Sequence, residues 1–126
     1  MAESKKNLFH CKTRLRVMAG DTIALGPGKI DLLEAIGRCG SISAAARETQ
    51  LSYRRAWDMV DTMNRCFKEP LVIGSTGGRG GGGARLSPLG EEMIRHYRAM
   101  ESLAEKASRK EWNIIRRFLK PPAEPS

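Results

Sequence analysis

The chain has 126 residues and a formal net charge of +8 at pH 7, and only 6% of its residues are aromatic. A chain of this length is typical of one domain with at most an appended helix, which excludes a second globular unit. The excess of basic residues indicates a nucleic-acid or acidic-membrane partner, but no apolar run approaches the ~20 residues of a transmembrane helix.

The N-terminal part predicts a flexible arm over residues 1–9 and a strand from His10 to Met18. Apolar and basic residues alternate in this strand, which is the period of a half-buried strand. The basic outer side suits phosphate contacts, or equally a sheet edge protected from aggregation. Thr22–Leu25 is predicted to be a short return strand. The alternation places Cys11, Thr13, Leu15 and Val17 on one side and Lys12, Arg14, Arg16 and Met18 on the other.

Gly26-Pro27-Gly28 predicts the start of a helix, because proline at the first helical position loses no hydrogen bond. The helix is expected from about Lys29 to Arg38, with Glu34 and Arg38 forming an i, i+4 ion pair. Gly40 is expected to end it in a left-handed cap. We assign this helix to the core as scaffold.

The stretch from Gly40 to Cys66 predicts two helices joined by a tight turn. Ser43 is the expected N-cap of a short alanine-rich helix, Ala44–Thr49. Leu51 is expected to fill the angle between the helices, and Ser52 to cap the second helix.

The second helix is amphipathic and carries arginines in its first turn. This arrangement is typical of a DNA-reading helix-turn-helix, and the alternative is an ordinary helical hairpin with a solvated basic face. The predicted apolar stripe consists of Tyr53, Ala56, Trp57, Val60, Met63 and Phe67, and the polar face consists of Arg54, Arg55, Asp58, Thr62 and Arg65.

A glycine-rich stretch, Gly74–Ala84, lies between two short predicted strands, Leu71–Ile73 and Arg85–Ser87. It is interpreted as a flexible linker, as a nucleotide-binding loop or as the wing of a winged helix. We favour the wing, because glycine backbone can approach phosphates closely and Arg79 can enter a minor groove.

Ser87-Pro88 predicts the start of a long helix that continues to about Lys120, where Pro121-Pro122 ends it. Its apolar residues nearly follow a heptad pattern, which indicates pairing with a second copy; the alternative is packing onto the domain's own sheet. The domain prediction is a winged helix-turn-helix over 10–87, a dimerisation helix over 88–120 and a tail over 121–126. The expected dimer residues are Met93, Tyr97, Met100, Ala104, Ala107, Ile114 and Phe118.

The three cysteines, Cys11, Cys39 and Cys66, are odd in number and widely spaced, which favours reduced thiols in the cytoplasm over disulfides. The N-terminus has no apolar signal-peptide core. His10-Cys11 is the only close pair of metal-ligand types, so no metal site is predicted. No nucleophile–base arrangement is evident, so the chain is not expected to be an enzyme.

Taken together, these elements resemble the N-terminal DNA-binding domain of the molybdate-responsive transcriptional regulators, the ModE family, which is distantly related to LysR-type winged helices. The resemblance covers about residues 12–105. It is carried by Gly40–Ser43, Ser52-Tyr53 with Ala56–Asp58, Met63-Asn64, Thr76–Ala84 and Leu86–Gly90.

The resemblance implies that Ser52, Tyr53, Arg54 and Arg55 begin the helix that enters the major groove, and that Thr76–Gly83 form the wing. Full-length members of the family continue into molybdate-binding domains. Because this chain ends at Ser126, we expect the oxyanion pocket of the family to have no counterpart, and no cofactor is predicted. The resemblance still implies a link to molybdenum metabolism, with molybdate as the associated ligand.

We therefore predict a mainly α protein with a small β-hairpin (α+β) that binds double-stranded DNA as a homodimeric transcriptional regulator, without a membrane association. Two alternatives remain open: a winged helix that binds another protein, and a minimal oxyanion-responsive regulator. The predicted DNA-binding residues are Ser43, Ser52, Tyr53, Arg54, Arg55, Asp58, Thr62, Thr76, Arg79, Gly80, Gly81 and Arg85.

Overall fold

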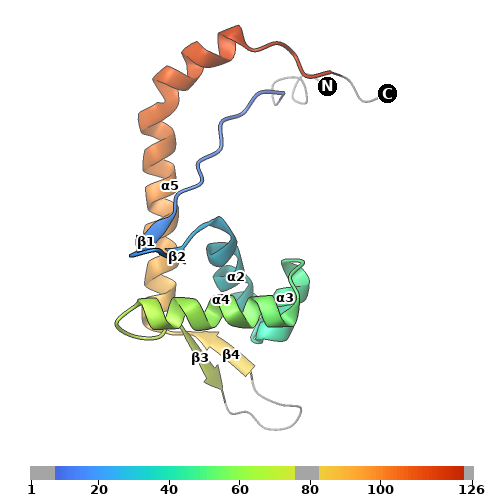
Figure 1. The fold of residues 1–126 in the computed structure, drawn as a ribbon, viewed down its shortest axis with the longest axis vertical. Helices are drawn as coiled ribbons and strands as arrows, with labels where there is room; N and C mark the ends of the chain where they lie inside the picture. The colour runs from blue at the N-terminus through green and yellow to red at the C-terminus, as the bar shows by residue number, and fades with distance from the viewer. Residues whose placement is uncertain (1–7, 76–82, 124–126) are drawn as a thin grey trace. The chain divides into compact units, whose positions relative to one another are not determined.

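The computed structural model describes residues 8–75 and 83–123 (Figure 1). The chain divides into two compact units, which are treated separately below. The winged unit is Arg14–Ala99. The tail unit combines Met1–Thr13 with Met100–Ser126, of which residues 8–13 and 100–123 are described.

In its described residues, 14–75 and 83–99, the winged unit contains three short helices, two antiparallel hairpins and the beginning of a long helix, which confirms a mainly α winged helix-turn-helix. In the second hairpin Val72 lies opposite Leu86 and Ser75 lies opposite Gly83. The elements in order are β1 (Val17–Ala19), β2 (Thr22–Leu25), α2 (Pro27–Cys39), α3 (Ile42–Glu48), α4 (Tyr53–Cys66), β3 (Val72–Ser75), β4 (Gly83–Leu86) and α5 (Pro88–Ile115).

The core lies where α2, α3 and α4 meet, and the second hairpin and the start of α5 close it. Small residues in α3 let α4 cross it closely, and the aliphatic residues of α2 fill the space between the helices. The largest fully buried side chains are those of Ile30, Leu32, Leu33, Ile36, Met63, Leu71 and Tyr97.

The ends of α2 follow the local sequence. Pro27 occupies the first turn, and Gly40 adopts a left-handed conformation with φ of 76° while its N–H donates to the Ile36 carbonyl oxygen at 2.9 Å. Both were predicted, because each depends on one residue's backbone preference.

The start of α5 is also held by a predicted residue. The Ser87 hydroxyl oxygen accepts a hydrogen bond from the Gly90 N–H at 2.9 Å, and the same hydroxyl donates to the Pro70 carbonyl oxygen at 2.7 Å. Ser87 is buried. This one side chain therefore caps α5 and ties it to the segment that precedes β3.

The predicted strand from His10 to Met18 is wrong in length, because only Val17–Ala19 form β1. Its partner β2 has four residues and ends at Gly26-Pro27, and the pairing is irregular between Val17 and Met18. The alternation itself holds from Lys12 onward. Thr13, Leu15 and Val17 are half-buried, and Lys12, Arg14, Arg16 and Met18 are exposed.

The predicted ion pair between Glu34 and Arg38 is also wrong. Arg38 pairs with Glu48 of α3. Glu34 instead accepts two hydrogen bonds from Arg98 of α5, at 2.7 and 3.0 Å. Partners brought close by the fold replace the i, i+4 partner, because a pair on one helix gains only about 0.2–0.5 kcal/mol.

In the tail unit α5 continues from Met100 to Ile115, and a 3-10 turn follows at Arg116–Phe118. The helical prediction to about Lys120 is therefore close. None of the helices in the described residues has the length and apolar character needed to cross a membrane.

Candidate DNA-binding surface

Ser41, and not Ser43, caps α3. The Ser41 hydroxyl oxygen accepts a hydrogen bond from the Ala44 N–H at 3.0 Å, and Ser41 has the extended backbone of an N-cap, with φ of −155° and ψ of 150°. The prediction placed the cap two residues too late. Ser43 lies inside the first turn of α3 with its side chain exposed, so it stays available for a DNA contact.

The turn between α3 and α4 is a Schellman motif. The Gln50 N–H donates to the Arg47 carbonyl oxygen at 3.2 Å, and the Leu51 N–H donates to the Ala46 carbonyl oxygen at 2.8 Å. Gln50 has a positive φ of 62°, at a position that glycine usually occupies. Leu51 packs partly against the core, as predicted, and the chain then enters α4.

The first turn of α4 is capped by Ser52, whose hydroxyl oxygen accepts from the Arg55 N–H at 3.0 Å, as predicted. Ala56, Val60 and Met63 are buried. The opposite face points to solvent: Arg54, Arg55, Asp58 and Arg65 are exposed, and Thr62 is half-buried.

Two members of the predicted apolar stripe do not belong to the core. Tyr53 is 56% exposed and Trp57 is 44% exposed. At 100° per residue, Trp57 projects about 60° away from Val60, which is enough to carry a large ring to the edge of the packed face. The three- and four-residue spacing was right, but the stripe is narrower than predicted.

Asn64 fixes α4 against the hairpin. Its side-chain oxygen accepts from the Leu71 and Val72 N–H groups at 2.8 and 3.1 Å, and its amide donates to the Val72 carbonyl oxygen at 3.0 Å. The Ala84 N–H donates to the Gly40 carbonyl oxygen at 2.9 Å, which joins β4 to the start of the helix-turn-helix. The sequence analysis assigned Asn64 no such role, because the partner backbone of this amide is brought to it only by the fold.

A shallow groove of about 360 Å³, here called the α2–α4 groove, gathers several predicted DNA-binding residues. Arg54 Nε lies 3.5 Å from Asp58 Oδ1, an exposed i, i+4 ion pair. Within the described residues no carboxylate lies within 4 Å of Arg55. The groove is lined by Lys29, Ser52, Arg54, Arg55, Asp58, Met59 and Thr62.

Lys29 was missed as a member of this surface. Burial and the nearby Arg55 guanidinium lower the pKa of Lys29, so two cations meet here. A lysine in the first turn of a helix is also opposed by the helix dipole, where acids are usual. No acid occupies the first turn of α2. That unfavourable placement was the signal in the sequence.

The hairpin contributes one described candidate, Arg85, whose side chain is exposed on β4. Four others lie outside the described residues. These are Thr76, Arg79, Gly80 and Gly81.

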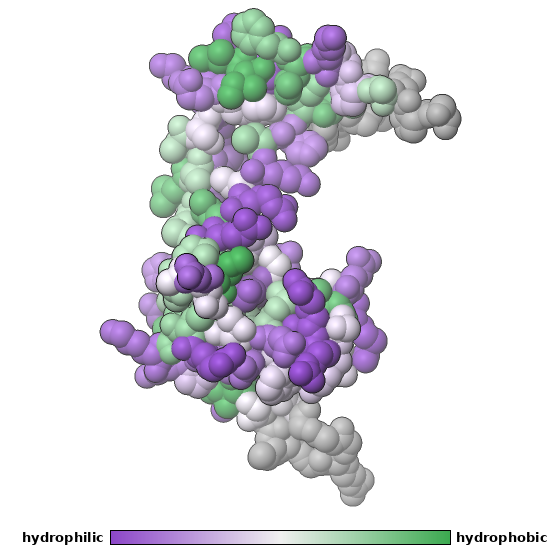
Figure 2. Space-filling model, viewed as in Figure 1, coloured by the Kyte–Doolittle hydropathy of each residue, from purple (hydrophilic) through white to green (hydrophobic). Residues whose placement is uncertain are grey.

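The predicted dimer residues fall into two groups. Tyr97 is 1% exposed in the winged-unit core, and Met93 packs partly against that core, so Tyr97 is removed from the predicted dimer face. In the tail unit Met100, Ile114 and Phe118 are exposed, as are Leu103, Ile115 and Leu119, which the prediction omitted. Ala104 is half-buried and Ala107 is exposed. Figure 2 shows hydrophobic residues gathered over the end of α5.

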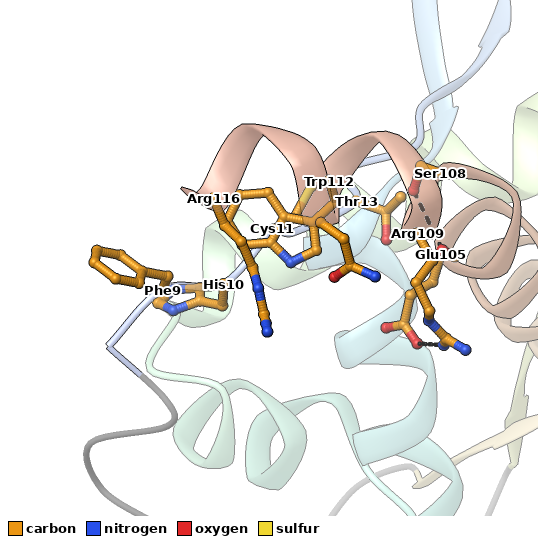
Figure 3. Close-up of a pocket in the computed structure, with 10 residues that line it drawn as sticks. Phe9, His10, Cys11, Thr13, Glu105, Ser108, Arg109, Trp112 and Arg116 are labelled. Atoms are coloured by element: carbon orange, nitrogen blue, oxygen red, sulfur yellow. Dashed lines mark hydrogen bonds and ion pairs between the residues drawn. The ribbon is translucent and has the colours of Figure 1, made fainter. Parts of the chain in front are cut away.

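The tail unit also holds an open pocket of about 400 Å³ between residues 9–13 and α5 (Figure 3). Trp112, Arg109 and Arg116 line it from α5 and the turn that follows, and His10 and Cys11 line it from the N-terminal segment. Of the predicted DNA-binding and dimer residues that the structure describes, none lines it. Across the described part of the chain no cluster of three metal-ligand residues occurs.

Comparison with known proteins agrees with this geometry. A model of the lysR family of bacterial regulatory helix-turn-helix proteins matches residues 28–91, just over half of the chain. The match begins in α2 and ends in the first turn of α5, so it contains the whole helix-turn-helix and its hairpin.

Among curated proteins, the molybdenum-pterin-binding protein MopB of Rhodobacter capsulatus is 53% identical over 78 residues, which is 62% of this chain and 29% of MopB. The molybdenum transport protein ModE of Azotobacter vinelandii is 51% identical over 78 residues, again 62% and 29%. The DNA-binding transcriptional dual regulator ModE of Escherichia coli (strain K12) is 41% identical over 81 residues, 64% of this chain and 31% of that protein.

The chain thus spans about a third of the length of the curated relatives it matches. The matched family consists of regulatory proteins rather than enzymes. The chain belongs to the lysR family of bacterial regulatory helix-turn-helix proteins, and its DNA-binding helix-turn-helix is homologous to that of the ModE regulators.

Proposed function

We propose that the protein is a homodimeric, sequence-specific regulator of transcription that acts in the cytoplasm, where bacterial DNA lies. The observation that supports this most directly is the first turn of α4, where Arg54 and Arg55 are exposed while Ala56 and Val60 anchor the helix to the core. A helix held in this way can enter a major groove without losing its packing.

The contacts divide into two kinds. Arg55 has no acidic partner among the described residues and reaches base edges, where an arginine bound to guanine contributes about 1–3 kcal/mol of discrimination. Lys29, Arg54 and Arg85 contact phosphates, which gives affinity without sequence preference and makes it fall with salt. Arg79 of the glycine-rich segment completes the phosphate contacts.

Dimerisation depends on the tail unit. Leu103 is 65% exposed and Phe118 is 81% exposed, and Met100, Ala107 and Ile114 lie on the same side of α5 as Leu103 at helical spacing. A second copy covers this face, and the twofold axis sets two half-sites about 34–36 Å apart along the duplex.

The regulated genes belong to molybdenum metabolism in this proposal. The support is the similarity to a molybdenum transport protein at 51% identity and to a molybdenum-pterin-binding protein at 53% identity. The similarity covers the DNA-binding part, so it supports a shared kind of operator more directly than a shared ligand.

Selection of bound sites from random duplex DNA, with and without molybdate, tests this function. We expect enrichment of a twofold-symmetric site, and an affinity that falls steeply between 50 and 200 mM salt, by about 10³-fold or more. If no DNA site is enriched and retention on DNA does not depend on salt, DNA binding is contradicted and a protein-interaction role is favoured. An enriched site without twofold symmetry contradicts the dimer.

A further inference from the structure

We infer that Trp57 is part of the DNA-contacting surface, where its indole ring packs against thymine methyl groups in the major groove. This inference rests on the proposed DNA binding and adds a source of base preference to it. The sequence pattern had assigned Trp57 to the core.

The core of the winged unit is complete without the Trp57 ring, which the fold leaves partly exposed to solvent. Its side chain is 44% exposed, and Tyr53, one turn earlier on the same side of α4, is 56% exposed. Two adjacent aromatic rings at the surface leave a large apolar area in water, which is typical of an interaction site rather than of scattered surface residues. Within the described chain nothing accepts a hydrogen bond from the Trp57 indole N–H.

The position of the ring follows from the helix. At 100° per residue, Trp57 and Asn64 project within about 20° of each other. Asn64 bonds to the backbone of β3, so this side of α4 faces the second hairpin. Trp57 therefore lies between the exposed arginine face of α4 and the hairpin, and a duplex that contacts both must pass over it.

The charges around the ring identify the kind of partner. Arg54 lies three residues before Trp57 on the neighbouring row of the helix, held by Asp58 at 3.5 Å. Lys29 and Arg55 lie in the α2–α4 groove on the other side of that row. An apolar ring next to a basic helix face, on which Lys29 and Arg55 have no acidic partner within the described residues, suits a polyanion that also presents apolar groups. The thymine C5-methyl is the apolar group that a major groove displays.

A single-tryptophan protein tests the contact directly, because the chain has only two tryptophans and the other, Trp112, lies in the tail unit. In Trp112→Phe, the emission of Trp57 and the anisotropy of a labelled selected duplex are measured in one titration. We expect the emission to change and to saturate at the same DNA concentration as the anisotropy. A rise in anisotropy without a change in emission overturns the inference and leaves the proposed DNA binding intact. No rise in anisotropy overturns both.

The thymine preference is tested by replacing thymine with uracil, which lacks the methyl group, at each position of the selected site. We expect one such replacement to weaken binding of the starting protein about 5–10-fold. It should leave binding by Trp57→Ala nearly unchanged, and Trp57→Ala itself should lose about 10-fold on the thymine duplex.

Arg65→Ala is the matched control, because Arg65 is also exposed on α4, one turn beyond Asp61, and is not in the α2–α4 groove. It should keep the full sensitivity to uracil. Thermal unfolding of Trp57→Ala establishes that the variant folds. If Trp57→Ala folds and binds the thymine duplex as tightly as the starting protein, the inference is overturned. The exposed ring would then be assigned to contact with another protein.

Discussion

The Tyr97 hydroxyl donates a hydrogen bond to the Leu15 carbonyl oxygen at 2.7 Å. It links the N-terminal segment to α5 within the winged unit, across 82 positions of the chain. The ring of Tyr97 is buried in the core, so the bond explains why a residue on the heptad pattern of α5 faces inward. The first turns of α5 belong to the winged unit, whereas the exposed apolar face begins further along.

Tyr97→Phe should therefore lower the free energy of unfolding by about 1–2 kcal/mol, because the Leu15 carbonyl oxygen loses its partner in a half-buried place. It should leave the oligomeric state unchanged. Urea unfolding and sedimentation measure the two effects. Tyr53→Phe, which removes an exposed hydroxyl, is the control and should cost little. If the Tyr97→Phe dimer dissociates while its free energy of unfolding is unchanged, Tyr97 contributes to the dimer interface and not to the core.

Glu34 and Arg98 predict a dependence of stability on pH. The hydrogen bonds from Arg98 lower the pKa of Glu34 below its usual 4.5, so the folded state favours the carboxylate. This stabilisation is complete above the unfolded pKa and is lost as the pH falls through the lower folded pKa. Glu34→Gln should be less stable than the starting protein at pH 7, and the difference should shrink below about pH 4.5.

Unfolding by urea at pH 7, 5 and 3 measures this difference. Glu69→Gln, at an exposed site between α4 and β3, is the matched control and should change stability little at any pH. A Glu34→Gln deficit that stays constant down to pH 3 would mean that packing, and not charge, accounts for the effect.

Leu103→Glu should convert the dimer to a monomer if the exposed face of α5 is the interface. A charge in the middle of an apolar helix pair is costly, and the side chain is exposed in the single chain, so folding should be unaffected. Sedimentation and far-ultraviolet circular dichroism measure assembly and folding. Ser108→Glu adds the same charge on the pocket side of α5 and should leave the dimer intact. Equal dissociation in both variants would place the interface elsewhere.

Arg55→Ala and Lys29→Ala should separate base recognition from phosphate binding. Arg55→Ala should relax the preference at one base position by about 1–3 kcal/mol. Lys29→Ala should weaken binding to all sequences alike and reduce the salt slope by about one, and Arg79→Ala should behave in the same way. Competition binding on the selected site and its single-base variants distinguishes them. A uniform loss in Arg55→Ala would reassign that side chain to the backbone.

Gly90→Ala should lower the free energy of unfolding by about 1–3 kcal/mol, because an added Cβ would collide with the Leu71 carbonyl backbone. Gly28→Ala is the control in the first turn of another helix. Its Cβ would meet only Met59 Cε at 3.8 Å, an ordinary contact, so stability should change by less than about 1 kcal/mol. Thermal unfolding compares the two. Equal stability would mean that α5 moves away from Leu71, in the segment that precedes β3, at little cost.

Features that depend on one residue and its neighbours were predictable. Proline at the start of α2, the cap at Ser52, the cap at Ser87 and the left-handed Gly40 all follow from backbone preferences and nearby hydrogen bonds. The sequence by itself therefore determined the order of the helices and hairpins, the helix-turn-helix and the exposed arginines of α4.

The tertiary structure alone decided which side chains meet across elements. A heptad pattern says that Tyr97 and Leu103 belong to apolar faces, but only the packing of the winged unit buries the first and leaves the second exposed. The periodicity of α4 likewise included Trp57 in its stripe, and the width of the core excluded it. Periodicity gives the direction of a side chain relative to its own helix, whereas burial depends on what the rest of the chain places there.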